Sequence, residues 1–369
     1  MKLSETQLRD WLRLSMTENV GPATFRTLIN RFGGAGQALQ ALPDISSRGG
    51  IRRPLRICSK EDAERILNNA AALDARFIAY GETDFPSLLP HADGCPPLLC
   101  VKGNIACAAR PTVAIVGARN ASALGLKFTR QIARELGAAG FTTVSGLARG
   151  IDTAAHEASS QTGTVAVLAG GIDNIYPPEN AELYRQIIEH GGAIVTEMIP
   201  GTKPQAKHFP RRNRIISGMS YGTVVIEAAQ RSGSLITARL ANEQNRVVFA
   251  VPGSPMDPRA SGTNKLIRQG AVLTTCSQDV LDHLAPMLEP QFPSLGSIDE
   301  PERTEFDYHE DVPQNVREQI ISLLGTVPVE IDDLIRESGH PPALVLTVLL
   351  ELELAGRLQR HGRQSVSAL

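Results

Sequence analysis

Positive charge is concentrated in one short stretch of the chain. Residues 203–214 (KPQAKHFPRRNR) contain Lys203, Lys207, Arg211, Arg212 and Arg214 and no acidic residue, although the formal net charge of the chain is −2. Such a patch attracts anions whatever the overall charge. We expect the arginines in the first turn of a helix, where cations oppose the helix dipole, so an anion bound between them would explain the cluster. A solvated basic turn is the alternative.

The acidic residues give little support to catalysis. Asp152 and His156 are four residues apart on an expected helix, where Asp152 most simply caps the helix. Asp173 and Glu227 could form an acid pair, but no nucleophile or metal-ligand spacing accompanies them. The five cysteines lack CxxC spacing, which favours free thiols. We therefore expect a binding protein rather than an enzyme, with no metal and no cofactor.

Regular alternation of apolar strands and amphipathic helices begins at residue 112. Strands are expected at 113–117, 142–146, 164–170, 193–198, 222–228, 246–251 and 271–275. Unbroken apolar strands such as Val113-Ala114-Ile115-Val116 require cover on both faces. This pattern predicts an α/β fold, a doubly wound and mostly parallel sheet.

Nearly every expected strand ends in a loop rich in glycine or serine. In open α/β sheets ligands bind at the carboxyl ends of the strands, where bare amides can meet phosphate. The loops and the basic stretch would then share one rim. No loop has the Walker A or G-x-G-x-x-G pattern, which weakens the nucleotide-binding interpretations. The candidate phosphate-binding residues are Gly117, Arg119, Ser145, Gly146, Gly170, Gly171, Lys203, Lys207, Arg211, Arg212, Asn213, Arg214, Ser232, Gly233 and Ser234.

The parts of the chain on either side of this region have different sequence patterns, and the whole chain is predicted to contain four segments. Residues 1–105 read as a helical domain and connector, in which a Val-Gly-Pro turn at Gly21 between two helices resembles a helix-hairpin-helix unit or a plain αα-hairpin. Residues 106–285 form the α/β domain, and 286–311 an acidic, proline-rich linker. Residues 312–369 have the outline of a winged helix. Its third helix, 343–353, is too apolar to read DNA, so we favour a protein-contact or regulatory role. Arg357, Arg360 and Arg363 alone carry suitable charge.

Composition places the chain among globular proteins. Hydrophobic residues make up 42%, there is no run of 18 apolar residues, and the N-terminus has no apolar signal region. These features predict a cytoplasmic protein without membrane contact. Aromatic residues are only 4%, so base stacking could be only a minor term, with Tyr176, Phe209 and Tyr221 as candidates.

Five motifs occur in order between residues 116 and 237 and resemble the bacterial DNA-processing protein DprA (Smf) family. They are VGAR at 116–119, SGLARGIDTAAH at 145–156, GGIDNIYP at 170–177, HFPRRNRIISG at 208–218 and EAAQRSGSLIT at 227–237. The resemblance implies a Rossmann-like domain between a sterile-alpha-motif-like or helix-hairpin-helix domain and a winged helix. It implies a homodimer that binds single-stranded DNA without sequence preference, protects incoming DNA and helps to load RecA during natural transformation.

The resemblance also assigns roles to residues. Arg119, Arg211, Arg212 and Arg214 look like phosphate ligands, and Gly146, Gly170, Gly171, Ser232 and Gly233 look like positions of close approach. The family often has a basic residue where this chain has Pro178, a loss for which Lys203 or Lys207 could compensate.

Two other functions remain open from the sequence. Arg214 and Glu227 could be fitted to a phosphoribohydrolase of the lysine-decarboxylase-like family, although EAA at 227–229 stands where a Pro-Gly-Gly-x-Gly-Thr loop is expected. A winged-helix transcription factor is disfavoured by the apolar third helix.

Overall fold

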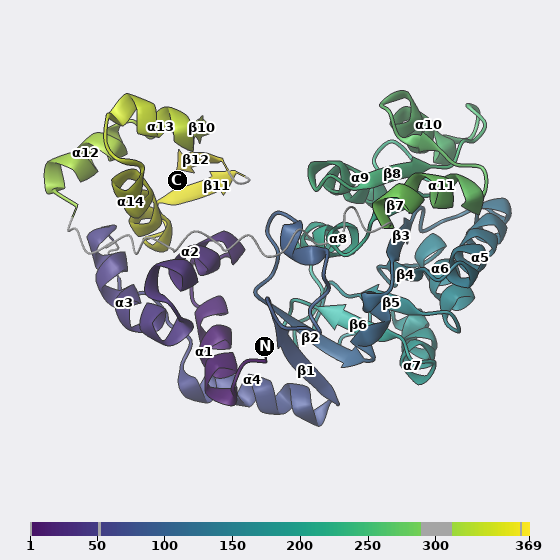
Figure 1. The fold of residues 1–369 in the computed structure, drawn as a ribbon, viewed down its shortest axis with the longest axis horizontal. Helices are drawn as coiled ribbons and strands as arrows, with labels where there is room; N and C mark the ends of the chain where they lie inside the picture. Colours follow the sequence, from purple (N-terminus) through teal and green to yellow (C-terminus); the bar gives the residue numbers. More distant parts are fainter. Residues whose placement is uncertain (1, 51–52, 289–311, 362–363) are drawn as a thin grey trace, which may run out of the picture. The chain divides into compact units, whose positions relative to one another are not determined.

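The computed structural model describes the chain except for residues 1, 51–52, 289–311 and 362–363. It divides into two compact units (Figure 1). The α/β unit comprises residues 66–293 with the first two residues, and the terminal unit comprises residues 3–65 and 294–369. Most of the expected linker at 286–311 lies outside the described residues.

A nine-stranded sheet forms the centre of the α/β unit, in the order β1-β2-β6-β5-β4-β3-β7-β8-β9. The strands are β1 (Ala75–Ala79), β2 (Leu98–Gly103), β3 (Thr112–Val116), β4 (Thr142–Ser145), β5 (Thr164–Val167), β6 (Ala193–Thr196), β7 (Gly222–Val225), β8 (Val247–Ala250) and β9 (Val272–Leu273). Strands β3 to β9 pair in parallel, and β1 and β2 are added antiparallel beside β6. The predicted mostly parallel α/β fold is confirmed.

The first two strands correct the predicted domain boundary at residue 105. β2 pairs with β6 from Cys100 opposite Thr196 to Gly103 opposite Ala193, so it belongs to the main sheet. β1 pairs with β2 in turn. The sequence around them is rich in proline, which concealed the edge of the sheet. The α/β unit therefore begins before residue 75 rather than at residue 106.

Helices cover both faces of the sheet. They are α5 (Ala123–Ala138), α6 (Ile151–Ser159), α7 (Ala181–Glu189), α8 (His208–Gly218), α9 (Gly233–Glu243), α10 (Ser261–Arg268) and α11 (Ser277–Leu288). Side chains of β3 alternate between two apolar clusters, with Ala114 and Val116 on the α8–α10 side and Val113 and Ile115 on the α5, α6 and α11 side. This double cover explains why the strands are apolar throughout.

The strand order reverses at β3. The chain runs from β3 outward through β4, β5 and β6, and returns to the other side of β3 with β7, β8 and β9. The loops after β3 and β7 therefore diverge at the carboxyl edge of the sheet, which is where doubly wound folds bind ligands. The candidate loops lie along this same edge.

The terminal unit contains two small domains. The hairpin domain consists of α1 (Glu5–Ser15), α2 (Pro22–Phe32) and α3 (Ala35–Arg48), and α4 (Lys60–Ala72) leads into the sheet. Ser4 and Gln7 form a capping box at the start of α1, and Gly33 ends α2 in the left-handed conformation at φ 74°. These local signals explain why this segment was recognisable as a helical hairpin.

The winged helix closes the chain. It contains α12 (Gln314–Ser322), α13 (Ile331–Ser338) and α14 (Pro342–Leu354), with a small sheet in the order β10-β12-β11 formed by β10 (Val329–Glu330), β12 (Ser365–Ala368) and β11 (Leu358–His361). Both predicted flanking folds are thus present. No helix in the described part of the chain has the length and apolar content that a membrane crossing needs.

Candidate nucleic-acid interface

Arg119 is an exposed arginine in the loop that follows β3. It is exposed and makes no ion pair with another described residue, and its guanidinium carbon lies 5.4 Å from the ring centroid of Phe209. The Tyr176 ring packs edge-on against Phe209 at 5.8 Å between centroids, and 45% of Tyr176 is exposed. A free cation beside an exposed aromatic ring can meet a phosphate and a base together.

Arg212 lies near the same ring but is buried. Its guanidinium carbon is 5.9 Å from the Phe209 centroid, yet only 6% of the residue is exposed. Burial lowers the pKa of Arg212 to about 10, and the Asp152 carboxylate opposes this shift. Nε of Arg212 finds no hydrogen-bond acceptor in the part of the chain that the structure describes. A buried cation with an unsatisfied donor is unusual in a folded protein and is explained readily by an anionic ligand.

Gly146 is what allows Arg212 to occupy this place. A Cβ atom on Gly146 would stand 1.2 Å from a terminal nitrogen of Arg212, so any side chain here would displace the guanidinium. The close approach expected at Gly146 is therefore an approach of Arg212. The Gly146 amide is also engaged, because it donates to Asp152 Oδ2 at 3.1 Å.

Asp152 and His156 hold the loop after β4 from inside. Asp152 Oδ2 accepts the Gly146 amide and, at 3.4 Å, the Ala148 amide, which corrects the prediction that it caps α6. Burial raises the pKa of Asp152, while Arg212 and these amides lower it. His156 Nε2 accepts the Leu147 amide at 3.4 Å, and burial followed by the charge of Arg212 lowers the pKa of His156 to about 3. Asp152 and His156 are both buried.

The basic stretch separates into exposed and internal cations. Lys203, Lys207 and Arg211 are exposed. The Arg214 side chain is 13% exposed and binds the Glu197 carboxylate and the Gly94 carbonyl, so its predicted role as a phosphate ligand is corrected to an internal ion pair. Arg211 Nε lies 3.3 Å from Glu197 Oε1, but its side chain is 55% exposed and keeps access to solvent. Helix α8 begins at His208, slightly earlier than expected.

Several of the loop residues predicted to bind phosphate pack against neighbouring protein segments. Ser145 is fully buried, and its hydroxyl donates to the Ile115 carbonyl at 2.6 Å. A Cβ on Gly117 would strike Ile151, and one on Gly171 would stand 2.6 Å from the Ile199 carbonyl oxygen. A Cβ on Gly170 would likewise crowd Pro204. These glycines make room for neighbouring protein segments.

The loop at the start of α9 contains the remaining candidates. The Ser232 hydroxyl accepts the Ser234 amide and lies 2.7 Å from the Ser234 hydroxyl, so both serve the helix cap. Asn213 is buried and donates to the Gly233 carbonyl at 3.4 Å. Gly233 itself is exposed, and a Cβ there would meet nothing within 4 Å. Gly233 is the member of this loop that a ligand could approach.

Glu227 occupies the point where the strand order reverses, a role that the sequence did not reveal. Its carboxylate follows β7 and accepts hydrogen bonds from the Ser122 amide at 2.9 Å and the Ser122 hydroxyl at 2.6 Å. Ser122 caps α5, so Glu227 takes the place at this helix N-terminus that a nucleotide phosphate takes in related folds. Among the described residues, no group of three His, Cys, Asp or Glu side chains could hold a metal ion.

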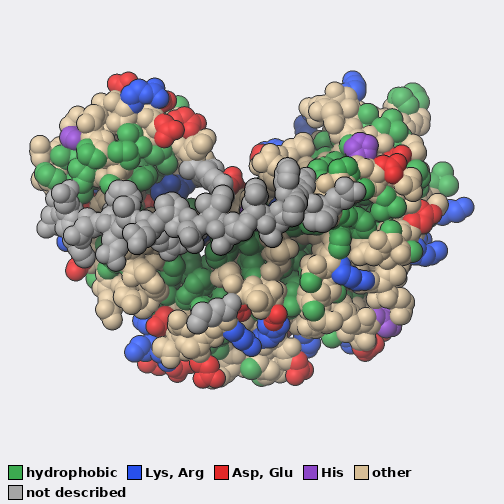
Figure 2. Space-filling view, in the orientation of Figure 1, with side chains coloured by type: hydrophobic (Ala, Val, Ile, Leu, Met, Phe, Trp, Pro, Cys, Tyr) green, Lys and Arg blue, Asp and Glu red, His purple; other side chains and the backbone are tan. Residues whose placement is uncertain are grey.

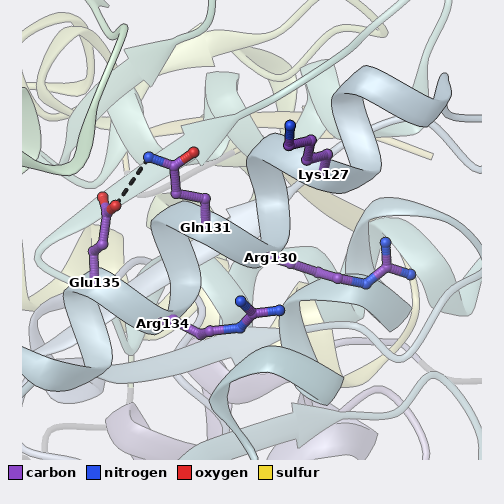
Figure 3. A pocket seen from close by; sticks show the side chains of 5 residues that line it. All are labelled: Lys127, Arg130, Gln131, Arg134 and Glu135. Atoms are coloured by element: carbon purple, nitrogen blue, oxygen red, sulfur yellow. Dashed lines mark hydrogen bonds between the residues drawn. The ribbon is translucent and has the colours of Figure 1, made fainter.

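A shallow hollow on the outer side of α5 is a second cationic feature. It is lined by Lys127, Arg130, Gln131, Arg134 and Glu135, and Arg130 and Arg134 extend to one side of the helix while Gln131 and Glu135 lie on another (Figure 3). Glu135 accepts a hydrogen bond from Gln131 at 2.9 Å and Arg130 lies 3.5 Å from Glu157. On the face shown in Figure 2, blue and red side chains lie close together at the right-hand edge, where α5 lies in Figure 1. We assign this hollow to the solvated surface.

The order of domains, with a helical hairpin, a mostly parallel α/β sheet and a winged helix, is that of a class of DNA-processing proteins. Three family models match in this order: DprA-like N-terminal HHH domain at 5–68, DNA recombination-mediator protein A at 76–285, and DprA winged helix domain at 309–362. The second covers more than half of the 369 residues. The chain belongs to the DNA recombination-mediator protein A family, which confirms the resemblance seen in the motifs.

Individual relatives agree with this assignment. Protein Smf of Escherichia coli (strain K12) is 40% identical over 273 residues, which are 73% of this chain and 71% of the relative. DNA processing protein DprA of Bacillus subtilis (strain 168) is 42% identical over 56% of this chain and 70% of its own length. The solved structure of DprA from Streptococcus pneumoniae superposes with a TM-score of 0.63 at 35% identity, over 76% of this chain and 98% of that one. A structure that concerns the single-stranded DNA binding mode of the Helicobacter pylori protein gives 0.52 at 28% identity, over 57% and 96%.

Proposed function

We propose that this protein binds single-stranded DNA without sequence preference through the carboxyl edge of its parallel sheet. The observation that carries the proposal is the pair of guanidinium groups beside the Phe209 ring, with Arg119 exposed and Arg212 buried with an unsatisfied Nε. Both can bind phosphate oxygens. Lys203, Lys207 and Arg211 extend the positive surface along α8 and the segment before it.

Contacts of this kind do not read sequence. Phosphate and sugar contacts position a strand, and specificity needs hydrogen bonds to base edges. The exposed Tyr176 ring and the partly buried Phe209 ring offer a surface on which any base can stack. The solved structure of the Helicobacter pylori protein concerns its single-stranded DNA binding mode. The similarity of that structure to this chain supports single-stranded DNA binding here as well.

We propose further that the protein protects incoming DNA and helps RecA to load on it during natural transformation. The support is the family and the relatives named DNA processing protein DprA. A mobility shift with a single strand, repeated with RecA, tests this role. We expect RecA to bind the strand sooner when this protein is present, and equal RecA binding with and without it would contradict the role.

A homodimer is the third part of the proposal. Strand β9 ends the sheet, with β8 as its pairing partner, and its Leu273 is 50% exposed. Met256, in the loop after β8, is 89% exposed. Unprotected edge strands with apolar side chains favour association. Leu273→Arg should halve the mass measured by light scattering, and an unchanged mass would place the contact elsewhere.

A matched pair of arginine variants tests the DNA site. Arg119→Ala should lower the affinity for several unrelated single strands by similar factors, about tenfold or more, as expected for a lost charged hydrogen bond. Arg134→Ala removes an exposed arginine from α5 and should leave the affinity within about twofold. Equal losses in both variants, or a loss that depends strongly on sequence, would contradict the proposed site.

The two residues on which the phosphoribohydrolase alternative depends are both engaged in contacts within the protein. Arg214 is held by Glu197 and Gly94, and Glu227 is held by Ser122. Incubation with nucleoside monophosphates should release no free base.

A further inference from the structure

Helix α14 is apolar on all sides because two different cores cover it. Val345, Val348, Leu349 and Leu352 belong to the core of the winged helix. Leu350 and Leu354, one turn apart on another face, belong to the core of the hairpin domain with Leu28 and Leu42 of α2 and α3. The sequence predicted a protein contact for this helix. Its partner is the other end of the same chain.

Polar groups fix the position of α14 against the hairpin domain. Glu353 accepts a hydrogen bond from the fully buried Thr24 at 2.6 Å. The turn between α1 and α2 contributes Asn19, whose side-chain amide donates to the Leu354 carbonyl at 3.0 Å. Asn19 thus satisfies a free carbonyl at the end of α14, as helix termini require.

The basic residues of the winged helix are directed to the same contact. Arg357 donates to the Gly49 carbonyl at 3.2 Å, at the end of α3. Arg360 binds Glu353 at 2.8 Å. Arg363 lies outside the described residues. Two of the three arginines that could have held DNA are therefore engaged within the protein.

Gly49 sets how closely α3 and α14 approach. A Cβ at this position would stand 2.0 Å from the Glu351 carbonyl oxygen and 2.8 Å from Ala355 Cβ. The backbone at Gly49 has φ −70°, which alanine adopts freely. Alanine here would conflict with α14 and with little else.

We propose that the hairpin domain is the receptor for the winged helix, and that the hairpin turn and α14 serve this contact instead of binding DNA. In this contact Leu28 and Leu42 cover one face of α14. The carboxyl end of α14 accepts a hydrogen bond from Asn19 in the turn between α1 and α2. The two ends of the chain then act as one module, and binding of nucleic acid is left to the α/β unit.

Hydrogen exchange on the full chain tests the contact. Gly49→Ala should speed amide exchange at least about tenfold in peptides from 344–354 and 42–49, and leave peptides from the sheet unchanged. Gly21→Ala is the control, because a Cβ at Gly21 meets nothing within 4 Å. Thr24→Val removes the donor to Glu353 at nearly constant volume and should act in the same peptides. Unchanged exchange at 344–354 in both Gly49→Ala and Thr24→Val would overturn the proposal.

DNA binding provides the second readout. Gly21→Asp places a good capping residue with negative charge at the turn, where it would repel a phosphate. We expect the affinities for single-stranded and duplex DNA to stay within about twofold of the unmodified chain. A tenfold loss would show that the turn binds DNA. A tenfold gain in duplex affinity in Gly49→Ala would show that docking hides a DNA-reading surface, and would equally refute the proposal.

Discussion

Arg212 should stabilise the fold as well as bind DNA, whereas Arg119 should act on DNA alone. Replacing Arg212 by methionine keeps most of the apolar contact with Phe209 but removes the positive charge next to the buried Asp152. The two charged groups attract each other without a direct ion pair, so the loss should be smaller than the cost of breaking a buried salt bridge. Because Asp152 also keeps the Gly146 and Ala148 amides, we expect a destabilisation of about 1–2 kcal/mol. Arg119→Ala, at an exposed position, should change stability by less than about 0.5 kcal/mol.

Urea unfolding at several pH values measures this difference. Burial raises the folded-state pKa of Asp152, and removal of Arg212 should raise it further. A carboxyl group with a raised folded-state pKa favours the folded state when it is protonated, so the deficit of Arg212→Met should narrow as the pH falls toward that pKa. The double variant with Asp152→Asn should be less destabilised than the sum of the single variants. An Arg212→Met protein as stable as the unmodified chain at neutral pH would refute the role given to Arg212.

Three further predictions concern groups around the rim. His156 has a folded-state pKa of about 3, so below pH 6.5 its imidazole is protonated in the unfolded chain but not in the folded chain. The free energy of unfolding should therefore fall by up to about 1.4 kcal/mol per pH unit relative to His156→Gln, as measured from urea midpoints. Parallel pH profiles of the two proteins would contradict this. Gly146→Ala should reduce both stability and single-strand affinity by displacing Arg212, while Gly233→Ala, with open space around it, should leave the stability unchanged. Equal losses of stability in the two variants would exclude the steric mechanism. Glu227→Ala should lower the free energy of unfolding by about 1–3 kcal/mol, because it removes the acceptor of two hydrogen bonds from Ser122. An unchanged free energy of unfolding in the same urea assay would mean that these two bonds contribute nothing to stability.

The architecture was predictable because it rests on local patterns. Runs such as Val113 to Val116 identify buried parallel strands, and the turn at Gly21 identifies the hairpin. Strands β1 and β2 were misplaced because antiparallel pairing with β6, about 90 residues away, leaves no local signal. The partner of α14 was hidden for the same reason, since its contacts in α2 and α3 lie some 300 residues earlier in the chain.

The site was predictable in its location but not in its details. Arg211, Arg212 and Arg214 are close in sequence, but on helix α8 their side chains have different environments. Arg211 is exposed to solvent, Arg212 is buried, and Arg214 is paired with Glu197. Periodicity alone does not show which arginine finds an internal acid, because that acid, Glu197, lies outside the helix in the loop after β6. Burial of a charged group, as at Arg212, depends on a single glycine in another loop.

The salt dependence of single-strand binding tests the central claim most directly. If Arg119, Arg212, Lys203, Lys207 and Arg211 neutralise five phosphates, the slope of log K against log salt should be about −3.5, at about 0.7 per phosphate, and should become shallower by about 0.7 in Arg119→Ala. A slope near zero, or one that Arg119→Ala leaves unchanged, would contradict recognition of the sugar-phosphate backbone by this rim.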